Sequence, residues 1–341
     1  MATFRSALRS YNAAVRRMER EDKRRAREAA IHFREQQKMQ AIEDARDAVA
    51  EWEDYVDFLQ TLHKSCTDPI DWYEFLNAPV PESPVHAKVN ADKVQYKIDN
   101  FKPSLFDRLI FDRLFSSIEK KMRSLEQQLA VAILEDERIY AENVERHKQE
   151  CEELGYLQGM AKGVLAKEAM HHKNAIEYFD PFSDITCLGS RIEMQFENEL
   201  VDATIHVHGD ELIPDYTLSQ TSSGKLSKKK MAKGAFNELY QDHVCSAVLR
   251  VARELFNYLH VTFVRVNAVA EMLNTQTGYK EKLLILSVII PRDTLDKMNL
   301  DAIDPSDSMG NFIHAMKFKK TDGFREIARV DWPPQHTHSD K

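Results

Sequence analysis

Apolar and polar residues alternate along much of the C-terminal half of the chain, in the pattern of half-buried strands. In the run 191–197, Ile192, Met194 and Phe196 fall on one side and the polar residues fall on the other. Pro214 limits a later, shorter run to the edge of a sheet, because proline cannot donate a ladder hydrogen bond. The pattern predicts five strands, over residues 191–197, 200–208, 211–214, 261–268 and 283–290.

A helical period separates the third predicted strand from the fourth. Apolar residues recur every three or four positions over 234–260, which predicts one long helix. A polar, lysine-containing loop is expected at 219–233, and short helices are expected at 293–298 and 308–318. The sequence thus predicts a mixed α+β head over 185–330, followed by a disordered tail over 331–341.

The N-terminal half reads as long helices with heptad spacing. Phe4, Leu8, Tyr11, Val15 and Met18 are four and three residues apart, and a second stripe follows over 42–59. The prediction is a coiled-coil stalk over 1–180. It is built from helices at about 2–64 and 104–167, joined by a proline-rich loop at 68–85.

Composition favours a soluble, reduced protein. The net charge of -8 argues against general attraction to phosphates. The four cysteines are far apart, as expected for free thiols in a cytoplasmic protein. No apolar run approaches the roughly 20 residues of a membrane span.

Charge is unevenly distributed along the first predicted helix. Its first 34 residues are basic and residues 35–60 are acidic. The basic start is compatible with contact to an anionic lipid surface or nucleic acid, with a transit-peptide-like composition, or with the solvated face of a coiled coil.

One catalytic interpretation comes from the predicted order of strands and helix. It is similar to the core of the PD-(D/E)xK nucleases, in which carboxylates hold a divalent cation beside a lysine. The candidates are Asp202, Asp215 and Lys225, with Glu211 as an alternative carboxylate. Thr217 stands where the motif requires lysine, so Asp202 and Asp215 also fit ordinary solvent-facing positions. Mg²⁺ is expected only under this interpretation, and no other cofactor is predicted.

The lysines of the polar loop are candidates for phosphate or nucleic-acid contact, because they precede a helix N-terminus. They also fit a mobile surface loop. The candidate binding residues are Lys225, Lys228, Lys229, Lys230 and Lys233. His206 and His208 lie two apart on a predicted strand and share a face. No third ligand follows from the spacing, so no metal site is predicted.

Three runs, 238–256, 304–309 and 311–320, together resemble a family of bacterial proteins with a basic helical N-terminus and a similar C-terminal head. The resemblance extends over most of the chain. It implies a bacterial cytoplasmic protein and no particular activity. The relatives are expected to carry Glu-x-Lys near Pro214, which this chain lacks, and that weakens the nuclease interpretation.

The leading hypothesis is a non-catalytic interaction protein. In it the stalk self-associates and presents the head to a partner, for example in a bacterial defence or stress system. The alternative is a metal-dependent nuclease or a nuclease-derived nucleic-acid binder.

Overall fold

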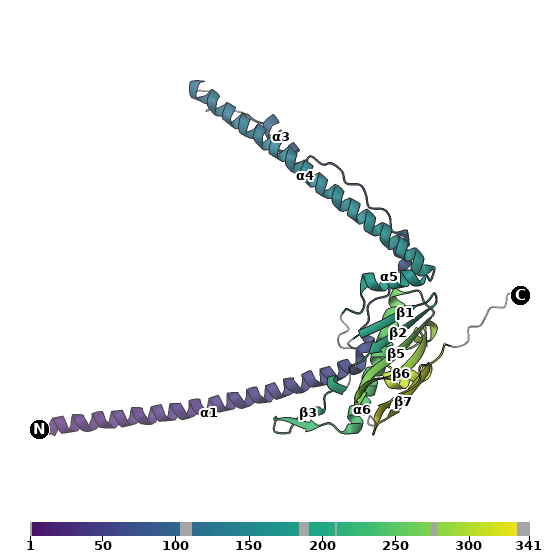
Figure 1. Ribbon diagram of the computed structural model, residues 1–341. Helices are drawn as coiled ribbons and strands as arrows, with labels where there is room; N and C mark the ends of the chain where they lie inside the picture. Colours follow the sequence, from purple (N-terminus) through teal and green to yellow (C-terminus); the bar gives the residue numbers. More distant parts are fainter. Residues whose placement is uncertain (1, 103–110, 184–190, 209, 274–277, 333–341) are drawn as a thin grey trace. The chain divides into compact units, whose positions relative to one another are not determined.

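The computed structural model describes residues 2–102, 111–183, 191–208, 210–273 and 278–332. It divides into two compact units, Met1–Pro69 with Phe179–Lys341, and Ile70–Tyr178 (Figure 1). The sequence analysis placed the N-terminal helix in one stalk with residues up to 180, whereas this division groups it with the head. The expectations for 104–110, 185–190 and 333–341 lie outside the described residues.

The head contains a mixed six-stranded sheet of order β1-β2-β5-β6-β7-β8. Its strands are β1 (Arg191–Phe196), β2 (Leu200–His206), β5 (Phe263–Leu273), β6 (Lys280–Pro291), β7 (Ile313–Lys319) and β8 (Gly323–Arg325). Neighbouring strands are antiparallel except β2 and β5, which are parallel. A parallel pair needs a crossover connection, and the helix α6 (Lys233–Tyr258) lies within the segment that provides it.

Strand alternation places an apolar face of this sheet against α6. Val264, Val266 and Ala268 on β5 are fully buried, as are Val244 and Val248 on α6. These β-branched and small residues suit a pleated surface packed closely against a helix. The core of the head is therefore the layer between α6 and the sheet.

The N-terminal helix α1 (Ala2–Thr61) is fixed to this core by its C-terminal end. Leu59 and, in the following 3₁₀ turn η1 (Leu62–Lys64), Leu62 are each 1% exposed. His63 accepts a hydrogen bond at Nδ1 from the Ser246 hydroxyl (2.8 Å) and donates from Nε2 to the Leu300 carbonyl (3.0 Å). The 42–59 stripe, which predicted a coiled-coil seam, thus packs against the head of its own chain.

The second unit is helical. It contains α2 (Trp72–Asn77), α3 (Val89–Asp99), α4 (Phe111–Leu165) and most of α5 (Ala169–Phe179). Asp136 on α4 accepts hydrogen bonds from the backbone N–H groups of Asn90 and Ala91, which fixes the start of α3. The sequence analysis did not predict α2 or α3. In the described part of the chain, no helix combines the length and the apolar content that a membrane crossing needs.

Three local predictions in the head were wrong. The expected strand at 211–214 is a 3₁₀ turn, η4 (Asp210–Leu212), followed by a strand that begins at Tyr216. The expected lysine loop is a β-hairpin of β3 (Tyr216–Gln220) and β4 (Leu226–Lys230). The expected final helix at 308–318 is mainly β7, where Ile313 to Met316 pair with β6.

Candidate functional site

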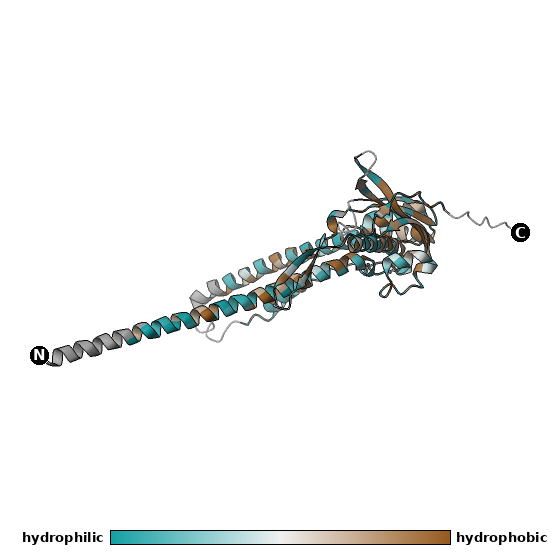
Figure 2. Ribbon diagram, turned by 90° about the horizontal axis from the view of Figure 1, so that it is seen from below, coloured by the Kyte–Doolittle hydropathy of each residue, from teal (hydrophilic) through white to brown (hydrophobic). Residues whose placement is uncertain are grey.

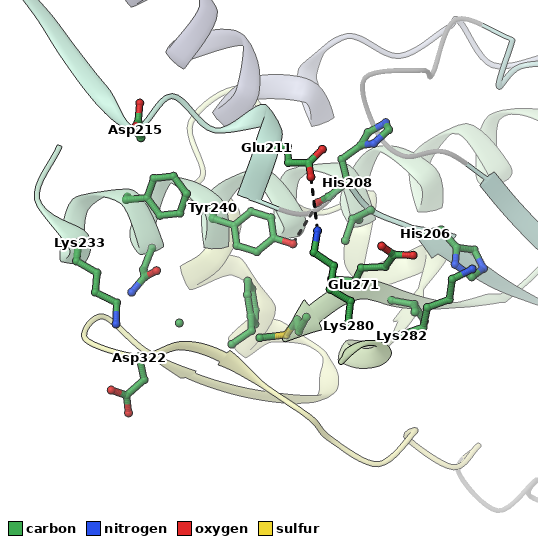
Figure 3. A pocket seen from close by; sticks show the side chains of 18 of the residues that line it. His206, His208, Glu211, Asp215, Lys233, Tyr240, Glu271, Lys280, Lys282 and Asp322 are labelled. Atoms are coloured by element: carbon green, nitrogen blue, oxygen red, sulfur yellow. Dashed lines mark hydrogen bonds and ion pairs between the residues drawn. The ribbon is translucent and has the colours of Figure 1, made fainter. Parts of the chain in front are cut away.

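A pocket of about 870 Å³ opens at one end of the head, beside the carboxyl ends of the parallel strands β2 and β5 (Figure 3). Ligands of α/β sheets commonly bind at the carboxyl ends of parallel strands, and most ligand pockets measure roughly 300–1,000 Å³. The first turns of α6 and the β7–β8 turn complete its wall. Position and size therefore make it the first candidate site on the head.

Aromatic side chains line the side of the pocket formed by α6. The Tyr240 ring packs edge-on against Phe324 with a centroid distance of 5.6 Å, and the Tyr240 hydroxyl donates to the His208 carbonyl (3.2 Å). Asn237 Nδ2 donates to the Lys320 carbonyl (2.6 Å), which holds the β7–β8 turn against the helix. Gly323 in that turn has φ +85°, a conformation that favours glycine.

Charged groups surround this aromatic wall (Figure 3). Lys280 Nζ lies 3.7 Å from Glu211 Oε1. Asp322 accepts hydrogen bonds from Thr321 and Arg325, which lower the pKa of its carboxyl group. Within the described residues, the pocket lysines Lys230, Lys233 and Lys282 take part in no ion pair. Positive charge at the rim is thus available to a ligand.

The hairpin β3–β4 carries most of the lysines that the sequence singled out. Lys225, Lys228, Lys229, Lys230 and Lys233 are all exposed, and the described residues place no carboxylate in an ion pair with any of them. Lys228 Nζ lies 3.6 Å above the centre of the Tyr216 ring. The result is a compact set of unneutralised cations, the lysine hairpin, which meets the pocket at Lys230 and Lys233.

The lysine hairpin is held against α1 at a defined point. Gln220 Nε2 donates to the Ile42 carbonyl (2.8 Å). Gly224, in the turn, has φ +79°, and a Cβ there would lie 2.7 Å from Ile42 Cγ1. Both the backbone angle and the close approach to α1 require glycine.

Comparison of the chain with models of protein families, with curated proteins and with solved structures finds no match. The resemblance to a bacterial family therefore stays a prediction.

The three nuclease candidates occupy different surroundings. Asp215 lines the pocket and Lys225 lies at the hairpin turn, whereas Asp202 lies on β2 within a buried polar cluster. Asp202, 9% exposed, accepts hydrogen bonds from Arg265 Nε (3.2 Å), Arg265 Nη2 (2.5 Å) and Asn267 Nδ2 (2.8 Å), and pairs with Arg329. Asp202 is thus not the solvent-facing residue that one interpretation expected.

A C-terminal segment covers this polar cluster. The Ser287 hydroxyl donates to Asn267 Oδ1 (2.8 Å) and accepts from the Val330 N–H (3.1 Å), and Arg265 donates to the Val330 carbonyl (2.9 Å). The guanidinium of Arg265 also stacks on Trp332, 4.5 Å from the ring centre. Because these polar groups bond to one another, the cluster has the character of a structural network.

The described residues contain no group of three His, Cys, Asp or Glu side chains that could hold a metal ion. His206 Nε2 lies 3.4 Å from Glu193 Oε1, across the β1–β2 pair. Burial raises the pKa of the Cys245 thiol, and burial together with Glu254 raises the pKa of Cys66 to about 11. Both thiols are therefore protonated at neutral pH, which disfavours a nucleophilic role.

The sequence analysis did not single out Lys280, Lys282 or Tyr240 as site residues. Lys280 and Lys282 lie in a charged run after Gly278, which was available as a signal. The sequence carried no signal for Tyr240 as a site residue, because Tyr240 falls on the apolar stripe of its helix.

Proposed function

We propose that the chain is an interaction protein whose head binds nucleic acid through the lysine hairpin. The main support for this proposal is the set of five exposed lysines that have no ion-pair partners among the described residues. Lysines that contact phosphates release condensed counterions, and this release drives sequence-independent binding. The overall charge of -8 does not oppose this, because the five lysines are gathered in one short segment, 225–233.

Binding without cleavage is the form we favour. Asp202, the carboxylate that a metal-dependent nuclease would require on β2, is paired with Arg265 and Arg329. A divalent cation would have to compete with both guanidinium groups and reach a residue that is 9% exposed. These contacts argue against Asp202 as a metal-binding carboxylate of a nuclease.

Fluorescence anisotropy with labelled DNA and RNA, at several salt concentrations, tests the proposal. Each phosphate contact removed should lower the slope of log affinity against log salt by roughly 0.9. The double variant Lys225→Gln/Lys229→Gln should therefore bind with a slope lower by roughly 2. The matched control is Lys93→Gln/Lys97→Gln on α3 of the other unit, which should bind like the wild type.

The nuclease alternative is tested in the same samples by adding Mg²⁺ or Mn²⁺ and following the nucleic acid on denaturing gels. Cleavage that disappears in Asp215→Asn would favour the enzyme over the binding protein. Absence of salt-sensitive binding by the wild type would remove the nucleic-acid function altogether.

A second candidate function is self-association of the helical unit. Val131 and Leu134, three residues apart on α4, are each 65% exposed. Apolar side chains in adjacent turns of a long helix are typical of a helix–helix contact, and a second copy of the chain is the proposed partner. Light scattering should give an oligomer for the wild type and a monomer for Val131→Lys/Leu134→Lys. A strictly monomeric wild type would contradict this function.

A further inference from the structure

The part of α1 that precedes its contacts with the head carries a row of cations on one face. The row consists of Arg20, Lys23, Arg27, Arg34 and Lys38. Their spacing of three, four, seven and four residues keeps them on a single side of a helix with 3.6 residues per turn. All five are exposed, and no ion pair within the described residues involves them. We call this row the basic face of α1.

The basic face lies on the same side of α1 as the residues that contact the head. Ala45, which is buried against the head, follows Lys38 by seven residues, or two helical turns, and Leu59 continues the row by two further heptads. The exposed acids Asp47 and Asp54 fall about half a turn away. The five cations of the basic face thus lie on the side of α1 that meets the head, and Asp47 and Asp54 lie on the opposite side, where Arg25 also falls.

The inner end of the basic face adjoins the lysine hairpin. The hairpin touches α1 at Ile42, four residues or about 6 Å along the helix axis from Lys38. Figures 1 and 2 both show β3 running beside α1, and Figure 2 shows the adjacent part of α1 as mainly hydrophilic. The two sets of cations are therefore neighbours, although 182 residues separate Ile42 from Gly224.

We propose that the basic face of α1 and the lysine hairpin form one site for a nucleic-acid duplex, contacted through its phosphates. This inference rests on the proposed function and assigns it a second surface and a class of ligand. From Arg20 to Lys38 the face is about 27 Å long, which matches about eight base pairs at 3.4 Å per pair. Arginine and lysine on a straight helix that lies along a duplex can reach phosphates of both strands over that length without reading bases.

A duplex fits this surface better than a single strand. Proteins that bind single strands combine cations with aromatic rings on which the bases stack. Phe33, the aromatic residue nearest the row, lies six residues beyond Arg27 and one before Arg34, on a different side of the helix. Along the basic face of α1, contacts to the backbone alone therefore remain, and they suit a regular duplex. The lysine hairpin adds one ring, Tyr216, and Lys228 lies over it at 3.6 Å.

An anionic membrane fits less well, because a helix that lies in a lipid interface needs an apolar face opposite its charged one. Ile31, Phe33 and Met39 are exposed, but separations of two and six residues turn them in different directions.

The test compares arginines on and off the basic face in the full-length chain. Arg27→Gln removes a cation of the face, whereas Arg25→Gln removes one that points away from it. Both residues are exposed, and glutamine retains helix propensity. Anisotropy is measured with a 30-base-pair DNA duplex, an RNA duplex of the same sequence and the separate strands. At 0.1 M salt, Arg27→Gln should weaken duplex binding roughly eightfold and Arg27→Gln/Arg34→Gln roughly sixtyfold. The salt slope should fall by roughly 1 and 2, and Arg25→Gln should bind like the wild type.

Three outcomes would overturn the inference. Duplex binding that is unchanged in Arg27→Gln/Arg34→Gln but weakened in Lys225→Gln/Lys229→Gln would leave the proposed function standing and remove α1 from the site. Tighter binding of the single strands than of either duplex would reject the class of ligand. Salt-sensitive binding to phosphatidylserine vesicles together with no binding to any nucleic acid would reject both the inference and the proposed function.

Discussion

Docking of α1 on the head should depend on a buried neutral histidine. His243 on α6 is fully buried, and its Nδ1–H donates to the Leu59 carbonyl of α1 (3.3 Å). Burial, and to a smaller extent the charge of His208, lower the pKa of His243 to about 4. The folded head therefore holds this imidazole neutral where an unfolded chain, with a pKa of about 6.5, would bind a proton.

The sign and size of the pH effect follow from this difference. Because the folded pKa is the lower one, the stability that the neutral ring provides is complete above about pH 6.5 and is lost as the pH falls toward 4. At pH 5 the unfolded ring is mostly protonated and the folded ring mostly neutral. The free energy of unfolding should then be about 2 kcal/mol lower than at pH 7.5 on account of His243 alone.

Urea denaturation at pH 7.5 and pH 5.0 measures this change in the free energy of unfolding. Trp52 on α1 can report on the head alone in a Trp72→Phe/Trp332→Phe background, since the chain has three tryptophans. His243→Asn keeps an N–H donor near the Nδ1 position and removes the titration. Between pH 7.5 and pH 5.0, the free energy of unfolding should fall by about 2 kcal/mol less in the variant than in its parent. The contributions of other acid-sensitive groups, His63 among them, are the same in the variant and its parent, so they cancel in the comparison.

An equal loss of stability in the variant and its parent would refute the reasoning, because it would mean that His243 binds its proton as readily in the folded head as in the unfolded chain.

Three further substitutions test other parts of the head. Asp202→Ala should lower the free energy of unfolding by about 3–5 kcal/mol in urea denaturation, because Arg265 is left buried without its carboxylate. Leu59→Ala should cost about 3–4 kcal/mol by opening a cavity where α1 meets the head, and hydrogen exchange should show α1 amides less protected. Gly224→Ala should cost about 1–2 kcal/mol, because it strains a positive φ and presses a Cβ on Ile42. A Gly224→Ala variant as stable as the wild type would show that the hairpin is not held against α1.

Local patterns in the sequence were enough to predict much of the fold. The alternation of Ile192, Met194 and Phe196 predicted β1, and the three- and four-residue spacing of apolar residues predicted α6. The mixed α+β character of the head follows from the same periodicities. They succeed because burial of one face imposes a period of two or 3.6 whatever the partner is.

The lysine hairpin and β7 show where local patterns failed. Lys228 to Lys230 have low strand propensity, and they form β4 because β3 pairs with them and α1 supports the turn at Gly224. The apolar spacing of Ile313 to Met316 is compatible with a helix or with a strand. These residues form a strand because they pair with β6. Hydrogen bonds to neighbouring strands, and in the hairpin also the contact of Gln220 with Ile42 on α1, outweighed local preference.

The sequence by itself determined the apolar faces of α1 and α6, the basic and acidic blocks of α1 and the lysine content of 225–233, because each follows from residue type and period alone. Only the tertiary structure decided what those faces meet. It turned the 42–59 stripe toward the head of the same chain, buried Asp202 between Arg265 and Arg329, and brought the basic face of α1 beside the lysine hairpin. The physical reason is that a pattern fixes which side of a helix or strand must be covered, whereas the covering surface depends on contacts between residues far apart in the chain.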